Sequence, residues 1–116
     1  MVQQPKSFPL SFWASSLGNE PTREWFRDLP EPDRTGLGRD LRRIQFGWPI
    51  GMPLVKSLGS GLWELRTSLP SKREARVMFC VNDETIIVLH GFIKKTQKTP
   101  GSEMKVAVKR MKELSL

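Results

Sequence analysis

The sequence contains few of the residues that build metal centres or disulfides. It has one cysteine, Cys80, and one histidine, His90. A single cysteine excludes an intrachain disulfide and a cysteine-rich metal site, and it is typical of a reducing cytoplasm. Because His90 has no Asp, Glu or Cys partner at ligand spacing, we predict no metal site and no cofactor.

The sequence also lacks long apolar runs and the loops of several enzyme classes. No stretch approaches the ~18 to 20 apolar residues of a membrane span. The segment from Phe8 to Leu17 is only mildly apolar and is interrupted by Pro9, so it predicts a strand rather than a secretory signal. Neither a nucleophile elbow nor a glycine-rich phosphate loop is present, which disfavours serine-hydrolase chemistry and nucleotide hydrolysis. We therefore expect a cytoplasmic protein with no membrane partner.

Positive charge, by contrast, is abundant. The 116 residues carry a formal net charge of +7 and a pI near 10.1, which favours an anionic partner such as nucleic acid or an acidic protein. Residues 1–58 include 8 basic and 6 acidic side chains, whereas residues 59–116 include 11 and 6. The length and the 38% hydrophobic content are those of one folded domain, 1–116. The second half of that domain carries most of the excess charge.

Apolar periodicity predicts a small α+β domain in the order strand, two helices, three strands, helix. The predicted strands are 8–12, 63–68, 73–81 and 84–93, and the predicted helices are 21–29, 31–46 and 101–114. Asn82 and Asp83 form a tight-turn signal, so the last two strands should be an antiparallel hairpin. Thr99 and Pro100 suit the start of the last helix. Three apolar residues ahead of the second strand are expected to cover a sheet edge: Leu54, Val55 and Leu58.

Cationic side chains recur on three of the predicted strands. Arg66 and Arg76 have matching outward parity on two of them. Lys94, Lys95 and Lys98 leave the end of the third, so several fixed positive groups could surround one phosphodiester. Preorganised charge of this kind binds an RNA backbone. It also stabilises the pentacovalent transition state that forms when a ribose 2′-OH attacks its own phosphate.

Two points about these strands stay open at the level of sequence. Arg66 could instead pair on the surface with Glu64 or Glu74. His90 shares strand parity with apolar and with charged residues, so spacing does not decide which way it faces. Three residues are further candidates for RNA contact: Arg73, His90 and Lys98.

The basic residues of the predicted helices also have two interpretations. They form either a solvated surface or a supporting patch for a nucleic-acid backbone or a partner protein. Those on the second helix are Arg34, Arg39, Arg42 and Arg43, and those on the last helix are Lys105, Lys109, Arg110 and Lys112.

Three sequence blocks in the second half of the chain have a specific composition and separation. They are Gly-Leu-Trp-Glu-Leu-Arg at 61–66, Arg-Val-Met-Phe at 76–79 and Leu-His-Gly-Phe-Ile-Lys-Lys-Thr-Gln-Lys-Thr-Pro at 89–100. Together they resemble the phage-derived, HigB-like branch of the RelE/HigB toxin superfamily, over roughly residues 54–114. The resemblance implies a RelE-like, microbial-ribonuclease-like fold in the order β-α-α-β-β-β-α, with an antiparallel sheet and helices packed on one side.

The resemblance also implies a function. It is that of the toxin of a type II toxin-antitoxin system, an endoribonuclease that cleaves mRNA, usually on the ribosome, and so inhibits translation and arrests growth. The implied partner is an antitoxin that often carries a helix-turn-helix domain, HigA-like, in a complex that binds operator DNA. At the matching positions, Arg66 and Arg76 would hold the scissile phosphate. Lys94 or Lys95 would stabilise the transition state or protonate the leaving 5′-oxygen.

The absence of tyrosine is the main departure from the superfamily. Some members place a tyrosine in the active site, whereas this sequence has none. Proton abstraction would then fall to His90, Glu64 or a lysine, or the reaction would depend mainly on positioning and charge.

Two other functions remain open from the sequence. A sister branch of the same fold poisons a protein target such as DNA gyrase, and a basic nucleic-acid-binding module would bind without cleaving. An endonuclease leaves new cuts within translated messages, whereas a gyrase poison leaves DNA breaks. A binding module shows only steeply salt-dependent association.

Overall fold

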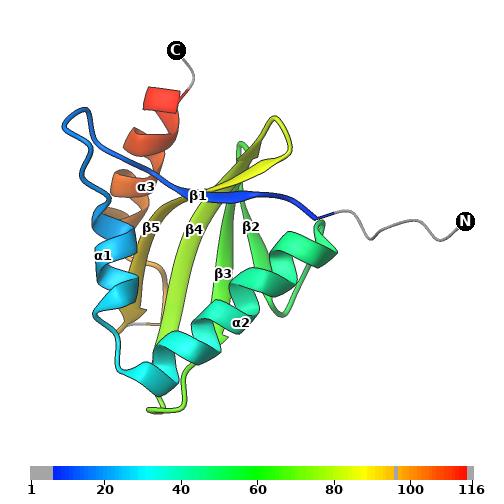
Figure 1. Cartoon of the computed structure of the whole chain (residues 1–116), viewed down its shortest axis with the longest axis vertical. Coiled ribbons are helices and arrows are strands. Elements are labelled where there is room, and N and C mark those ends of the chain that lie inside the picture. Colours follow the sequence, from blue (N-terminus) through cyan, green and yellow to red (C-terminus); the bar gives the residue numbers. More distant parts are fainter. Residues whose placement is uncertain (1–6, 96, 115–116) are drawn as a thin grey trace, which may run out of the picture.

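The computed structural model describes residues 7–95 and 97–114. These residues form a sheet with helices around it (Figure 1). In chain order the elements are β1 (Leu10–Phe12), α1 (Pro21–Arg27), α2 (Glu31–Gly47), β2 (Val55–Gly59), β3 (Leu62–Ser68), β4 (Glu74–Asn82), β5 (Thr85–Lys94) and α3 (Gly101–Leu114). The predicted α+β class is confirmed, and each predicted strand and helix is present. Strand β2 is an addition.

The sheet is mixed rather than antiparallel. Its strand order is β1-β5-β4-β3-β2. Strands β2 to β5 are antiparallel neighbours, whereas β1 runs parallel to β5, with Leu10 opposite Ile86. The expectation of a wholly antiparallel sheet was wrong, because alternating apolar residues identify a strand but not its neighbour or direction. The first strand lies at the sheet edge, where the preceding Pro9, which cannot donate to a strand ladder, is tolerated.

Strand β2 was not predicted, because a bulge interrupts its pattern. Val55 is buried and pairs with Leu65 on β3. The register then shifts between Ser57 and Gly59. The apolar residues Val55 and Leu58 are therefore three positions apart, whereas a regular strand would place them two or four apart. Residues 55–59 therefore do not cover the sheet edge, as we expected, but form the edge strand itself.

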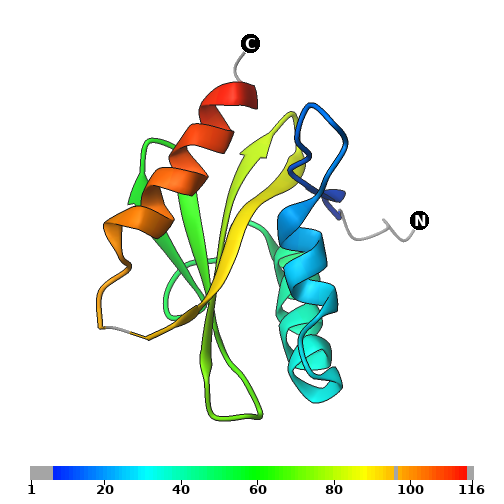
Figure 2. The same cartoon turned by 90° about the vertical axis from the view of Figure 1, so that its left-hand side faces the viewer.

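Helices cover both faces of the sheet, which Figure 2 shows with α3 on one side and α1 and α2 on the other. Leu41 of α2 and Phe79 belong to one core cluster, and Ala107 of α3 and Met78 belong to a second. The implied arrangement with helices on one side was wrong. Strand β4 directs Met78 and Phe79 to opposite faces, so both faces need apolar cover. No helix in the described ranges is long and apolar enough to cross a membrane.

The predicted hairpin between β4 and β5 is confirmed, although its turn is centred one residue later than the sequence signal. Asn82 pairs with Thr85. The two residues between them, Asp83 and Glu84, have φ angles of 53° and 58°. Positive φ at both central residues matches the right-handed twist of the flanking strands, so this two-residue turn closes a regular hairpin.

A bulge in β5 decides which way His90 faces. Met78 pairs with His90, whereas the next residue of β4 pairs with Val88, so Leu89 is the extra residue. Val88 belongs to the core beneath α2. His90 lies across from Met78 on the α3 side, and its Nε2 is 3.2 Å from Glu103 Oε1. Strict alternation along β5 would place the Val88 and His90 side chains on the same face of the sheet. The bulge at Leu89 reverses the alternation, so the two side chains lie on opposite faces.

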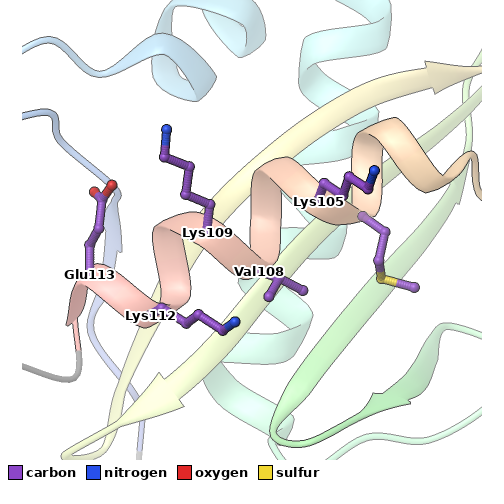
Figure 3. A pocket seen from close by; sticks show the side chains of 6 residues that line it. Lys105, Val108, Lys109, Lys112 and Glu113 are labelled. Atoms are coloured by element: carbon purple, nitrogen blue, oxygen red, sulfur yellow. The ribbon is translucent and has the colours of Figure 1, made fainter.

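Helix α3 carries two kinds of basic side chain. Three exposed lysines project from its outer face around Val108 (Figure 3): Lys105, Lys109 and Lys112. Arg110 differs, because it donates to the Leu89 carbonyl oxygen at 2.7 Å and lies 4.5 Å from the centre of the Trp13 ring. Burial lowers the pKa of Arg110, although an arginine remains charged. Arg110 is therefore a structural link to β5 and not solvated charge.

Asp33 connects the first turn of α2 to the loop between β3 and β4. Its carboxylate is buried and accepts hydrogen bonds from the Ser71 backbone N–H at 3.1 Å and from Arg73 Nη2 at 3.0 Å. Burial alone would raise the pKa of Asp33. The hydrogen bonds from Ser71 and Arg73, with the charge of Arg73, outweigh burial and lower it. Part of the Arg73 guanidinium is therefore used for a structural contact with Asp33.

We expect Asp33 to contribute to unfolding by acid. A carboxylate whose pKa is lowered in the folded protein stabilises it above the unfolded-state pKa of about 3.9, and this stability disappears as the pH falls through the lowered value. Urea unfolding of the Asp33→Asn variant should show lower stability than wild type near neutral pH and a smaller further loss below about pH 4. Equal acid-dependent losses in both proteins would contradict this role.

Gly91 allows α1 to approach β5 closely. A Cβ atom at Gly91 would lie 2.5 Å from the Trp25 ring. We expect Gly91→Ala to reduce the free energy of unfolding by about 1 to 3 kcal/mol, because the ring must move. Gly36→Ala is a matched control, since its Cβ would lie 3.5 Å from Pro70 and a helical alanine should stabilise by up to about 1 kcal/mol. Urea unfolding measures both, and equal effects would refute the steric explanation.

Candidate functional site

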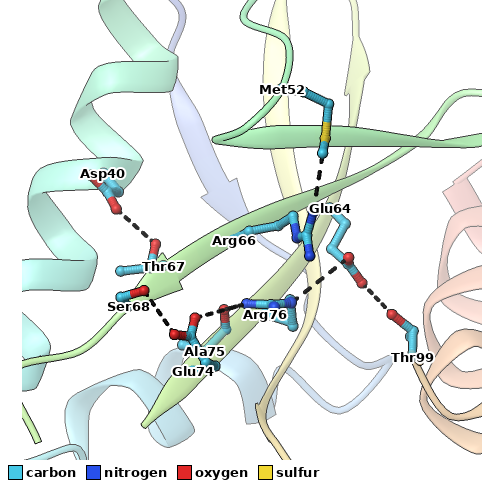
Figure 4. Close-up of polar contacts among 10 residues, drawn as sticks. All are labelled: Asp40, Met52, Glu64, Arg66, Thr67, Ser68, Glu74, Ala75, Arg76 and Thr99. Atoms are coloured by element: carbon cyan, nitrogen blue, oxygen red, sulfur yellow. Dashed lines mark hydrogen bonds and ion pairs between the residues drawn. The ribbon is translucent and has the colours of Figure 1, made fainter. Parts of the chain in front are cut away.

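Arg66 and Arg76 lie directly opposite each other on β3 and β4. We call these two residues the arginine pair (Figure 4). The shared face that strand parity predicted for them is confirmed. Like charges that face each other across two strands are destabilising unless neighbouring groups offset them. Nearby carboxylates must therefore offset the repulsion between the two guanidinium groups.

Arg76 is almost completely buried, with 5% of its surface exposed. Its Nε lies 3.9 Å from Glu64 Oε1, and its Nη1 lies 3.4 Å from Glu74 Oε2. Nη1 also donates to the Ala75 carbonyl oxygen at 3.0 Å. An unpaired buried charge would be strongly destabilising, so the two carboxylates make the position tenable. They also hold the planar guanidinium in one orientation (Figure 4).

Arg66 is partly exposed and is held less firmly. Its Nη1 donates to Met52 Sδ at 3.9 Å, and its backbone N–H donates to the Leu54 carbonyl oxygen at 2.8 Å. Within the described part of the chain, Arg66 forms no ion pair with an Asp or Glu. The alternative in which Arg66 pairs with Glu64 or Glu74 was wrong, because both carboxylates pair with Arg76 instead. The charge of Arg66 is thus available to a ligand.

Glu64 is a buried carboxylate beside the arginine pair, with 3% of its surface exposed. Thr99 Oγ1 donates to Glu64 Oε2 at 2.7 Å. We expected Thr99 to cap α3, but the helix begins at Gly101 and the Thr99 hydroxyl is used for Glu64. The segment that precedes α3 is therefore tied to the centre of the site.

Two hollows meet at the arginine pair. The smaller one, about 290 Å³, is also lined by three lysines: Lys56, Lys94 and Lys98. The larger one, about 620 Å³, lies toward the segment between α2 and β2 and is also lined by Arg43 and Met52. Because both arginines line both hollows, an extended anionic chain could pass over the pair.

Three of the predicted site residues line a different hollow. Lys95, Arg73 and His90 line a space of about 730 Å³ between α1, the end of β5 and the start of α3, which we call the β5 hollow. Lys94 lines both the β5 hollow and the smaller hollow at the arginine pair. The structure thus brings together Arg66, Arg76, Lys94 and Lys98, and it separates Lys95, Arg73 and His90 from them.

Sequence reasoning missed Lys56 and did not place Arg43 beside Arg66 and Arg76. Lys56 lies opposite Glu64 on β2, so it could be found only by recognising that strand. The available signal was the Gly-rich turn at 59–61, which is typical of a hairpin. Arg43 was grouped with the other basic residues of α2, either as solvated surface or as a separate supporting patch. It does form an ion pair with Asp40 at 3.3 Å, but it also lines the larger hollow.

Cys80, the one cysteine of the sequence, lies outside the site. It is buried beneath α3, and burial raises the pKa of its thiol, so Cys80 stays protonated and unreactive. Across residues 7–95 and 97–114, no three His, Cys, Asp or Glu side chains are placed to hold a metal ion. Cys80 therefore belongs to the core.

The arrangement around the arginine pair suits a phosphate group. A guanidinium offers forked N–H donors that match two oxygens of a phosphate. Glu64 and Glu74 neutralise two positive charges, and the three lysines of the smaller hollow leave it positive. The fixed donors and the excess charge can bind a phosphodiester and stabilise further negative charge that develops on it.

A family model matches most of the chain. Residues 24–112, which include the whole candidate site, match the model described as phage derived protein Gp49-like. A comparison with curated proteins found no significant match. The chain therefore belongs to the Gp49-like family of phage-derived proteins, which is a RelE-like toxin family in the broad sense.

Proposed function

We propose that this protein is the toxin of a type II toxin-antitoxin system, of the HigB-like branch, and that it cleaves mRNA on the ribosome. The arginine pair carries the proposal, since Arg66 and Arg76 face each other beside a hollow lined by three lysines. Membership of the Gp49-like family supports the toxin role. The net charge of +7 favours a polyanionic substrate.

In the proposed reaction, Arg66 and Arg76 hold the scissile phosphate. The ribose 2′-OH loses its proton and attacks the adjacent phosphorus, which forms a cyclic 2′,3′-phosphate, and the 5′-oxygen leaves with a proton. Lys94 lines the same hollow and stabilises the transition state or supplies that proton. Glu64 is the better-placed base, because it also lines this hollow whereas His90 lines the β5 hollow.

The proposal includes a partner protein and a cellular location. The partner is a cognate antitoxin with a helix-turn-helix domain, HigA-like, and the toxin-antitoxin complex binds operator DNA in the cytoplasm. The basic surface of the toxin, which includes three exposed lysines on α3, suits an acidic partner. Co-expression with the small protein encoded next to it should relieve growth arrest.

Mapping of RNA ends after induction tests the proposed activity. Wild type should produce new ends within translated messages, and blocking translation initiation should remove them. An Arg66→Ala variant should produce none. Cleavage of translated and untranslated RNA alike would contradict ribosome dependence. DNA breaks without RNA cuts would replace the endonuclease with a protein-targeting toxin of the gyrase-poison kind.

A further inference from the structure

The β5 hollow is lined by aromatic rings that the chemistry at the arginine pair does not use. The rings of His90 and Phe92 are stacked, with centroids 5.8 Å apart and an angle of 25° between their planes. Trp25 lines the same hollow from α1, on the other face of the sheet, and lies against Gly91. Flat aromatic surfaces in an open hollow are typical of sites that bind an unpaired nucleobase.

Polar groups of two kinds accompany these rings. Lys94 and Lys95 supply positive charge suited to a sugar-phosphate backbone, and Arg73 adds guanidinium donors although its charge is paired with Asp33. Glu103 lies 3.2 Å from His90 Nε2 and so fixes the plane of the imidazole. Because Phe92 lies against one side of the ring and Glu103 holds its edge, the 18% of the His90 side chain that is exposed is a preorganised stacking surface.

The β5 hollow is connected to the phosphate-binding centre. Lys94 lines both, so a ligand over the arginine pair can continue into the β5 hollow. Among the residues that the structure describes, the outer edge of β5 also has no partner strand there, although Gly91 and Phe92 themselves are buried. In the described chain, β1 pairs only with residues 86–88, and no strand lies beside residues 90–94 on that side. Backbone groups of the partly exposed Ile93 and Lys94 can therefore bond to the edge of a base.

We infer that the β5 hollow binds the base of the nucleotide next to the phosphate held by the arginine pair. The inference rests on the proposed function for the position of that phosphate. The ligand is single-stranded RNA, because only an unpaired base can stack on His90. Lys95 and Arg73 contact the backbone beyond that base. His90 thus binds substrate and does not transfer the proton.

Nuclear magnetic resonance can test this site directly, because His90 is the only histidine in the sequence. The probes are a 2′-O-methylated RNA trimer, which cannot be cleaved by attack of its own 2′-oxygen, the same trimer without bases, and inorganic phosphate. The trimer with bases should shift the His90 ring carbon-bound protons upfield, and the other two probes should not. Equal shifts with all three would overturn base stacking.

Matched variants separate stacking from charge. His90→Ala should weaken binding of the trimer with bases by about 5-fold or more, which corresponds to the lower end of the free energies measured for base stacking. The affinity for the base-free trimer should not change. His90→Phe should restore binding, since it keeps a flat ring. Lys95→Ala should weaken both trimers by the same factor. If His90→Ala weakens neither trimer, or both equally, the inference fails.

The binding test and the cleavage test can fail separately. Base-dependent binding without RNA cuts in cells would retain the β5 hollow as an RNA site and refute the nuclease. RNA cuts that require Arg66, with no base-dependent binding, would retain the nuclease and refute the inference. If neither trimer binds and a peptide strand pairs instead with the outer edge of β5, this surface is the binding site of a protein partner, and the inference fails.

Discussion

Replacement of Arg66 by alanine is expected to reduce the rate of mRNA cleavage by about 100- to 1,000-fold, the usual effect of removing one aimed donor to a charged transition state. The free energy of unfolding of the Arg66→Ala variant should be close to that of wild type. Arg66 is partly exposed and forms no ion pair with any Asp or Glu among the residues that the structure describes. Cleavage kinetics in a purified translation reaction and thermal unfolding of the same preparations measure the two effects.

Arg39→Ala is the matched control for Arg66→Ala. It removes the same charge from an exposed position on α2, on the opposite face of the sheet. Cleavage should be nearly unchanged in this variant. Arg66→Lys keeps the charge but loses the forked donor, so its cleavage rate should lie between those of wild type and Arg66→Ala. A fully active, folded Arg66→Ala protein would refute the proposed role of the arginine pair.

Arg76→Ala is expected to act first on stability, with a loss of about 3 to 5 kcal/mol in the free energy of unfolding. The reason is that the Glu64 carboxyl, 3% exposed, would lose its buried guanidinium partner, while the Thr99 hydroxyl would still donate to it. Loss of growth arrest in this variant would therefore report unfolding as well as chemistry. Urea unfolding of Arg76→Ala and Arg66→Ala, measured side by side, should separate the two arginines.

A double variant identifies the cause of that loss. Glu64→Gln removes the charge but keeps an oxygen for Thr99, so adding it to Arg76→Ala should recover part of the lost stability. The two changes should be non-additive by more than the ~0.5 kcal/mol typical of independent sites. Additive losses, or an Arg76→Ala protein as stable as wild type, would show that the buried ion pair does not hold this part of the sheet.

Periodicity predicted the elements of this fold well where a strand or helix is regular. The helix 101–114 and the hairpin of β4 and β5 are examples. It failed at β2, where the bulge between Ser57 and Gly59 removes the alternation, and at the parallel pairing of β1 with β5. Both failures have one physical origin. Strand pairing depends on contacts between distant residues, which a local pattern does not contain.

The candidate site was predictable to the extent that strand parity holds. Parity placed Arg66 and Arg76 on one face, and their opposition across β3 and β4 agrees with it. Burial could not be inferred in this way, so the assignment of Glu64 and Glu74 to Arg76 was missed. Alternation along the strand also could not predict which face of the sheet the His90 side chain is on, because that depends on the extra residue in β5.

The parallel pairing of β1 with β5 affects the order in which the nascent chain can assemble. Strands β2, β3 and β4 are neighbours in sequence and can pair as soon as they are synthesised. Leu10, however, must wait for Ile86, and the closure of so long a loop is slow because its entropy cost precedes the contacts. Helix α3 is completed later still. During synthesis, therefore, the strands that carry Arg66 and Arg76 can assemble before β1 completes one edge of the sheet and α3 covers one of its faces.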